Sequence, residues 1–257
     1  MADEIDTPDG AAWTIDPRAR AAMLLEAARE ALHEGDPAGA VALAEELLDD
    51  EPEEVEALLV VADAAPRYGH AEVGVLAARH AATCGVEIGA VLAAAQLAAC
   101  DVEAALETAE STLARDPRNA RAHAVRAQAL EVLGRASEAE AAFARAAALK
   151  PDAYPPPLAV SPDAWETHLL AALSGLDPDV RDALRRVQLT FEELPALADL
   201  RTLRPPPSPT VDALLRGDTI SLYRRNLARG LAAESELTVR IRDALDAEAR
   251  LLLDDEA

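Results

Sequence analysis

The sequence is poor in aromatic residues, and this shortage limits the kind of core it can form. Phe, Trp and Tyr make up 3% of the 257 residues, whereas hydrophobic residues as a whole make up 51%. The core must therefore be built mostly from Ala, Leu and Val. Alanine loses no side-chain entropy in a helix and lets helix axes approach closely, so the composition favours packed helices. We expect a fold that is mainly α.

Cysteine, lysine and long apolar runs are also scarce. Cys84 and Cys100 are the two cysteines, sixteen residues apart and without paired histidines nearby. This pattern argues against a disulfide framework or a structural metal site and predicts buried free thiols and no cofactor. The chain has no leader-like start and no run of eighteen apolar residues, so we expect a cytoplasmic protein without a membrane partner. High alanine and a single lysine, Lys150, are typical of a GC-rich bacterial genome.

Acidic residues dominate the charge, but unevenly. The net charge is -23, which would repel phosphate backbones, so nucleic-acid binding is not expected. Residues 1–56 hold seventeen carboxylates and three arginines, a net of -14, whereas residues 181–242 hold eleven arginines and eight carboxylates, a net of +3. These charges either lie on solvated helix faces or dock the two regions on each other or on a basic partner. A third interpretation is an acidic mimic of nucleic acid.

A repeat occupies the first 150 residues. GDPAGAVALAEELLDDEP and GRASEAEAAFARAAALKP place Gly, small or apolar residues and Pro at the same five positions, and two weaker copies lie between them. The marker residues are 34, 31 and 34 apart: Gly35, Gly69, Cys100 and Gly134. Glycine suits a turn, small residues let helices cross closely, and proline ends the second helix. The pattern predicts four helix-turn-helix units.

These units resemble the tetratricopeptide repeat (TPR) family over residues 18–151. The resemblance implies a helical solenoid whose concave surface holds a peptide or a partner protein. First helices of the units usually line that surface, which makes four residues candidates for partner binding: Arg67, Arg121, His123 and Arg126. A spacing or oligomerising role is the alternative.

The rest of the chain predicts a small α+β domain. Three consecutive prolines at 155–157 favour an extended linker at 152–162. Before the linker lie an acidic segment (1–17) and the repeats (18–151), and after it lies a second domain (163–257). Ser161 and Asp177 precede prolines that begin two helices. VQLTF at 187–191 and TISLY at 219–223 read as strands on either side of a proline-rich loop, and a last helix runs from about Glu234 to Leu253.

This order of elements resembles the minimal zincin-like metallopeptidases over residues 163–254. The family's His-Glu-x-x-His motif, whose histidines bind zinc and whose glutamate acts as the base, falls on Ala247, Glu248, Ala249, Arg250 and Leu251. Only Glu248 is kept, as a vestigial residue that we expect to be exposed with an ordinary pKa. We predict a pseudo-metallopeptidase without a metal.

Two functions remain open. The first is a non-catalytic adaptor or scaffold in which the strand at 219–223, with Tyr223 and Arg224, lies at the sheet edge and takes up an extended peptide. The second is a metallopeptidase or other hydrolase with an atypical site around Glu248 and the tail carboxylates at 254–256. His168, the lone histidine of this region, is expected to be structural and partly exposed, and Leu245, Leu252 and Val239 are expected to pack on the sheet.

Overall fold

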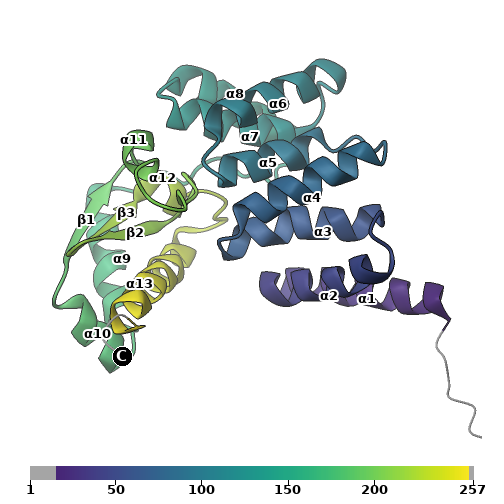
Figure 1. The fold of residues 1–257 in the computed structure, drawn as a ribbon. Coiled ribbons are helices and arrows are strands. Elements are labelled where there is room, and N and C mark those ends of the chain that lie inside the picture. The colour runs from purple at the N-terminus through teal and green to yellow at the C-terminus, as the bar shows by residue number, and fades with distance from the viewer. Residues whose placement is uncertain (1–15, 255–257) are drawn as a thin grey trace, which may run out of the picture.

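The structure is a computed structural model, and it describes residues 16–254. Its first part, which we call the helical array, is a chain of antiparallel helix pairs (Figure 1). The bounds are α1 (Pro17–Glu34), α2 (Pro37–Asp50), α3 (Val55–Ala64) with the 3-10 turn η1 (Ala65–Tyr68), α4 (Ala71–Thr83), α5 (Gly89–Ala98), α6 (Val102–Arg115), α7 (Ala120–Val132) and α8 (Ala136–Leu149).

The four marker residues all form the same turn. Gly35, Gly69, Cys100 and Gly134 have φ angles of 84°, 94°, 62° and 75° and lie between the first and second helix of each pair. The residue after each marker donates its N–H to a carbonyl five positions earlier, at 2.8 to 2.9 Å. This is the bond that closes a helix with a left-handed residue. The predicted repeat and its register are therefore confirmed.

Small residues set the close approach of the helices. In the second helices Ala40, Ala78 and Ala105 are fully buried. A Cβ atom on Gly89 of α5 would lie 2.1 Å from the hydroxyl oxygen of Thr112 in α6, so the two helices meet where only a hydrogen atom fits. The shortage of aromatic residues is compatible with a dense core because the backbones themselves are close.

The second part, which we call the sheet unit, comprises residues 162–254. Its sheet has the strand order β1-β3-β2, with β1 parallel and β2 antiparallel to β3. The bounds are α9 (Pro162–Ser174), α10 (Pro178–Leu184), β1 (Gln188–Glu192), α11 (Leu197–Leu200), β2 (Ala213–Arg216), β3 (Thr219–Tyr223), α12 (Arg224–Leu227), η2 (Glu234–Glu236) and α13 (Leu237–Asp254). The small sheet expected from the sequence is present.

Two expectations about the sheet are wrong. The sequence predicts a loop at 213–216, but these residues form β2, which pairs with β3 across a tight turn at Gly217 (φ 61°). Because β2 takes one edge and β1 the other, the strand at 219–223 lies in the centre and not at an edge. Four residues between a proline-rich loop and a glycine carry too little alternation to reveal a strand.

One stripe of α13 covers the sheet. Leu237, Ile241, Leu245 and Ala249 recur every four residues, all are fully buried, and they share a core with Ile220 and Leu222 of β3. Spacing by four keeps side chains on one helix face. Leu245 packs as expected, whereas Val239 does not, because it lies two positions off the stripe and is exposed.

The segment between the two parts is extended and anchored to the sheet unit. Residues 155–160 form no helix or strand, and Leu158 donates its N–H to the carbonyl of Ala228 at 3.3 Å. Ser161 then accepts a hydrogen bond from the N–H of Ala164 at 3.2 Å, as predicted, whereas the Asp177 side chain makes no such bond.

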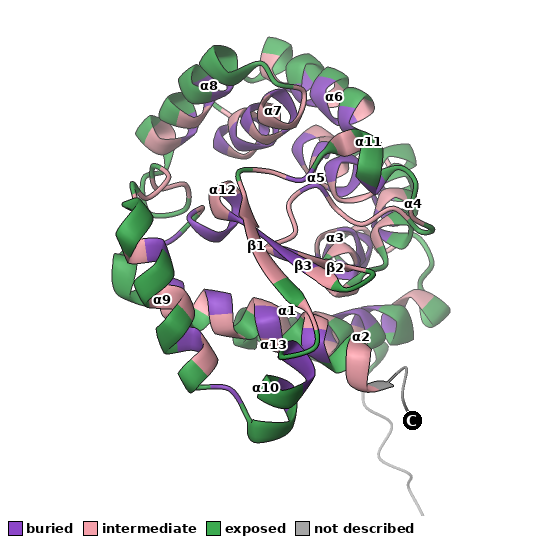
Figure 2. Cartoon of the chain, turned by 90° about the vertical axis from the view of Figure 1, so that its left-hand side faces the viewer, coloured by how far each residue is buried: buried purple, intermediate pink, exposed green. Residues whose placement is uncertain are grey.

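The sheet unit lies beside the array (Figure 1). Viewed from the side of the sheet unit (Figure 2), the helices from α1 to α8 form an arc, and β1, β3, β2 and α12 lie in front of it. Part of the array therefore faces the chain's own C-terminal part. Within residues 16–254, no helix combines the length and the apolar character that crossing a bilayer requires.

Candidate functional site

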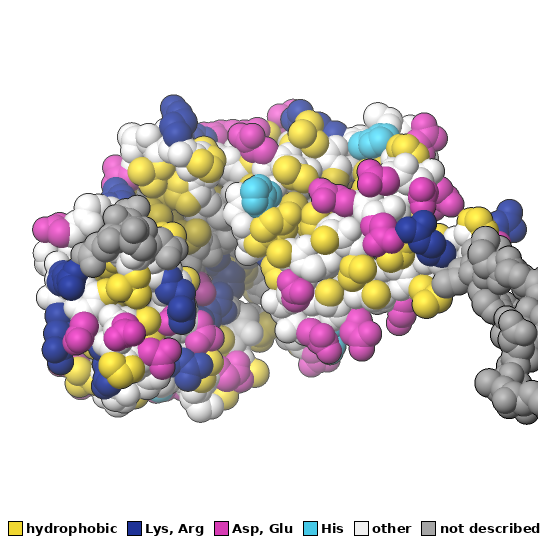
Figure 3. Space-filling model, turned by 60° about the horizontal axis from the view of Figure 1, so that its bottom comes forward, with side chains coloured by type: hydrophobic (Ala, Val, Ile, Leu, Met, Phe, Trp, Pro, Cys, Tyr) yellow, Lys and Arg dark blue, Asp and Glu magenta, His cyan; other side chains and the backbone are white. Residues whose placement is uncertain are grey.

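A cleft lies between the edge strand β2 and the helix α13, and we call it the β2 cleft. Its volume is about 670 Å³. The space-filling view also shows a hollow between the sheet unit and the array (Figure 3). The β2 cleft is lined by Val211, Asp212, Ala213, Leu231, Glu236, Val239, Arg240, Asp243, Ala244, Ala247 and Glu248.

The register of β2 leaves backbone groups free along this cleft. Tyr223 donates its N–H to the carbonyl of Asp212 at 2.9 Å, and the next pair along the ladder is Ala213 opposite Leu222. Antiparallel pairs alternate between bonded and non-bonded, so the N–H and C=O of Ala213 and Leu215 point away from β3, toward the open edge. The N–H of Leu215 is taken by the Glu248 carboxylate at 2.7 Å. The N–H of Ala213 and two carbonyls remain at the edge.

Glu248 differs from its expected state. It is half-buried, and burial raises the pKa of its carboxyl, with the hydrogen bond from Leu215 opposing that shift. The expectation of an exposed carboxylate with an ordinary pKa is wrong, because β2, which the sequence did not reveal, covers it. Ala247 and Leu251 are exposed on the same helix, and Ala249 faces the core.

Carboxylates outnumber cations around the cleft. Arg240 pairs with Asp212 through contacts of 2.8 and 3.1 Å, which leaves three further acidic side chains in the wall: Glu236, Asp243 and Glu248. Asp243 also contacts Arg242 at 3.0 Å. The remaining lining is apolar, so the cleft offers acidic groups beside an apolar surface.

Metal ligation around Glu248 was the basis of the hydrolase alternative. In the part of the chain that the structure describes, no three or more His, Cys, Asp or Glu side chains gather closely enough to hold a metal ion. The proposed tail ligands, the side chain of Asp254 and residues Asp255 and Glu256, lie outside the described residues.

The structure brings two of the four array candidates together. Arg67 and Arg121 both pair with Asp63 of α3, the first at 2.6 Å. His123 instead bonds the carbonyl of Pro117 at 3.0 Å, and Arg126 contacts Glu110 of α6 at 3.1 Å. Arg67 and Arg121 therefore neutralise one carboxylate between α3 and α7, whereas the other two bind the neighbouring turn and helix.

The two candidates of the sheet unit have different surroundings. Tyr223 is 1% exposed, and burial raises the pKa of its phenol. Because so little of it is exposed, its side chain offers almost no surface to a partner. Arg224 is half-buried, with its guanidinium 5.1 Å from the centre of the Phe191 ring and 3.2 Å from Glu193. His168 bonds Thr238 at 2.7 Å and Glu234 at 3.2 Å, in agreement with a structural role.

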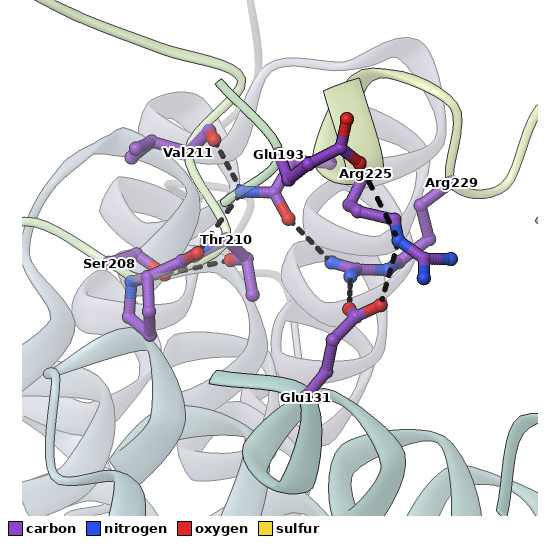
Figure 4. Close-up of polar contacts among 9 residues, drawn as sticks. Glu131, Glu193, Ser208, Thr210, Val211, Arg225 and Arg229 are labelled. Atoms are coloured by element: carbon purple, nitrogen blue, oxygen red, sulfur yellow. Dashed lines mark hydrogen bonds and ion pairs between the residues drawn. The ribbon is translucent and has the colours of Figure 1, made fainter. Parts of the chain in front are cut away.

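The contact that joins the two parts, which we call the junction, has no signature in the sequence. Glu131 of α7 pairs with Arg229 and lies 3.6 Å from Arg225, and its side chain is only 9% exposed (Figure 4). Burial lowers the pKa of Arg229, and Glu131 opposes that shift. Arginine keeps its charge in proteins, so Arg229 remains a cation. A sequence separation of 98 hides this pair from sequence reasoning.

A second pair, Arg201 with Glu103, lies at the same side of the array and is more exposed. The arginine-rich region at 181–242 thus reaches carboxylates of α6 and α7. The predicted docking partner was the acidic region at 1–56, of which residues 1–15 lie outside the described residues, and Glu103 and Glu131 do not belong to it. The net charge of a region does not say which of its groups becomes buried.

The comparisons with known proteins find a likeness of fold. No protein-family model matches the chain, and no curated protein matches it. TTC0263, a thermophilic TPR protein of Thermus thermophilus, is 23% identical, with 51% of this chain and 75% of that chain covered and a TM-score of 0.48. A MamA crystal structure is 18% identical, with coverages of 49% and 75% and a TM-score of 0.40. MamA 41-end from Desulfovibrio magneticus RS-1 is 20% identical, with 52% and 77% covered and a TM-score of 0.43.

Proposed function

We propose that the protein is a non-catalytic adaptor that binds an extended segment of a partner protein in the β2 cleft. The observation that carries this proposal is the free edge of β2, where the N–H of Ala213 and the carbonyls of Ala213 and Leu215 are unpaired, beside a cavity of about 670 Å³. An exposed strand edge accepts a further strand through backbone hydrogen bonds, and adjacent pockets select its side chains.

The lining suggests the chemistry of that segment. Glu236, Asp243 and Glu248 favour a basic side chain, and Val239 and Ala247 favour apolar neighbours. Contacts outside the cleft are proposed for the remaining candidates, Arg67, Arg121, His123, Arg126 and Arg224. We also propose the division into domains at 18–151, 152–162 and 163–257.

We further propose that the sheet unit is a degenerate zincin-like metallopeptidase. This is supported by the order of its elements, by α13 crossing the sheet, and by the position of Glu248 beside the edge strand. Zinc does not fit the residues present, because Ala247 and Leu251 have no donor atom where the family has histidines. No catalytic step is assigned to a metal.

A random-peptide library displayed on phage tests the adaptor. We expect wild-type protein to select peptides with Lys or Arg beside apolar residues, and Ala247→Arg, which places a cation in the cleft, to lose them. Leu170→Arg is the matched control. Leu170 is exposed on α9 and does not line the cleft, so this substitution adds the same charge at another place on the surface. Selected peptides that bind Ala247→Arg as well as wild type would refute the proposal.

A hydrolase remains the second candidate because of one observation. Glu248 is a half-buried carboxyl in the cleft wall, and burial raises its pKa. Carboxyl groups that act as general acids or bases in enzymes often have a pKa raised in this way. Incubation of a peptide library with the protein, read by mass spectrometry, tests it. Cleavage by the wild type that disappears in Glu248→Gln would favour the hydrolase over the adaptor.

A further inference from the structure

The junction is connected to the wall of the β2 cleft through Asn226 of α12. This side chain is 1% exposed. Its amide nitrogen donates to the carbonyls of Pro209 and Val211 at 3.1 and 2.6 Å, and its oxygen accepts from Arg229 at 2.9 Å. Both donor hydrogens and the acceptor are thus in use. Asn226 cannot turn without breaking bonds on both sides, so it links the position of Arg229 to the loop at 208–212.

A second path leads from the same arginine to the same loop. The carbonyl of Arg229 accepts from Arg240 at 2.6 Å, and Arg240 pairs with Asp212. The carbonyl of Asp212 in turn accepts the N–H of Tyr223, which is the first ladder bond before β2. Both paths therefore end in the loop at 208–212, directly before β2, and Val211 and Asp212 of this loop line the cleft.

The array holds the outer end of this chain of contacts. The guanidinium of Arg229 pairs with Glu131 of the array (Figure 4) and also donates to the side-chain oxygen of Asn226. Without Glu131 the cation would be left in a mainly dry place, and such a group moves toward water. If Arg229 moved, the side-chain oxygen of Asn226 would lose the hydrogen bond that it accepts from the guanidinium. The backbone carbonyl of Arg229, which accepts a hydrogen bond from Arg240, would shift as well.

We propose that Glu131 is a positioning residue for the β2 cleft, acting through Arg229 and Asn226 on the loop at 208–212. Docking of the array and the geometry of the free strand edge are then coupled, so whatever loosens the junction also loosens the cleft wall. The functional meaning of this coupling rests on the proposed peptide-binding role of the cleft. The coupling itself can be tested without a ligand, so the coupling and the peptide-binding role can be refuted independently.

Amide hydrogen exchange, resolved by NMR, tests the coupling in the full-length protein. The reporters are the N–H of Tyr223, bonded to Asp212, and the N–H of Val211, bonded to Ser208 at 3.3 Å. The reference is the N–H of Gln188, bonded to Asp218 at the far end of the sheet. In Glu131→Ala we expect exchange at the reporters to accelerate at least about tenfold and exchange at the reference to change less than about twofold.

Two further variants separate this relay from simple loss of docking. Glu103→Ala removes the exposed pair with Arg201 at the same side of the array, and we expect the reporters to keep their wild-type rates. Asn226→Asp removes the donors to Pro209 and Val211 while leaving Glu131 in place, and we expect it to accelerate the same reporters. Equal reporter rates in Glu131→Ala and Glu103→Ala, or acceleration of reference and reporters alike, would overturn the proposal.

Discussion

The energetics of the junction give a prediction whose size follows from burial. In Glu131→Leu, the Arg229 guanidinium, which in the wild type also bonds Asn226 and lies 5.5 Å from the centre of the Phe143 ring, loses its counter-ion. Removing one partner of a buried pair costs about 3–5 kcal/mol, and because the Arg229 side chain is 17% exposed and can move toward water, we expect a loss near the lower end, about 3 kcal/mol. This loss is a decrease in the free energy of unfolding of the sheet unit.

The reverse substitution and the double variant complete a cycle. Arg229→Met leaves Glu131 with Arg225 at 3.6 Å, so we expect a smaller loss of about 2 kcal/mol. Replacing both, as Glu131→Leu with Arg229→Met, removes both buried charges and keeps similar volumes. Such replacements are often neutral, so we expect the double variant to lie within about 1 kcal/mol of wild type.

Urea unfolding followed by two signals measures the cycle. In a Trp13→Phe background Trp165 is the remaining tryptophan and lies in the core of the sheet unit, whereas far-ultraviolet circular dichroism reports mainly the array helices. We expect coincident transitions in wild type and an earlier fluorescence transition in Glu131→Leu.

Glu103→Ala is the matched control for this cycle. Its pair with Arg201 has side chains 58% and 44% exposed, so its loss should cost less than about 1 kcal/mol. If Glu131→Leu lowers stability no more than Glu103→Ala, or if the double variant is as unstable as the worse single variant, the assignment of a buried pair is refuted.

Three further predictions concern single residues. Gly35→Ala should lower the free energy of unfolding by about 1 kcal/mol, because its φ is 84° and a Cβ there touches nothing, so a melting temperature equal to wild type would contradict the left-handed turn. Burial raises the pKa of Glu248, so the folded state keeps this proton to a higher pH than the unfolded chain does. As pH rises from about 4.5 through the raised pKa, the wild type should therefore lose stability relative to Glu248→Gln, and a gain in its relative stability would contradict the burial of this carboxyl. Burial also raises the pKa of the Cys100 thiol, so maleimide should label half-buried Cys84 first at pH 7, and faster labelling of Cys100 would count against that burial.

The sequence revealed features that depend on neighbouring residues, but it did not reveal contacts between residues that are distant in the chain. Ser161 caps its helix through an amide three residues away, and β3 spans the predicted TISLY, because both depend on neighbours in the chain. The position of β3 in the centre of the sheet depended on β2, whose four residues carry no pattern. The same missing strand explains the misjudged burial of Glu248 and of Tyr223.

The sequence by itself determined the helical array. Four markers at nearly constant spacing specify four identical left-handed turns, since each turn is closed by a bond between residues five apart and is decided within one unit. The tertiary structure alone decided which acidic residues became buried and paired. Glu131 resembles any other acidic residue on an array helix until Arg229, folded back from the sheet unit, removes it from water, because desolvation depends on what packs against a side chain and not on its place in the chain.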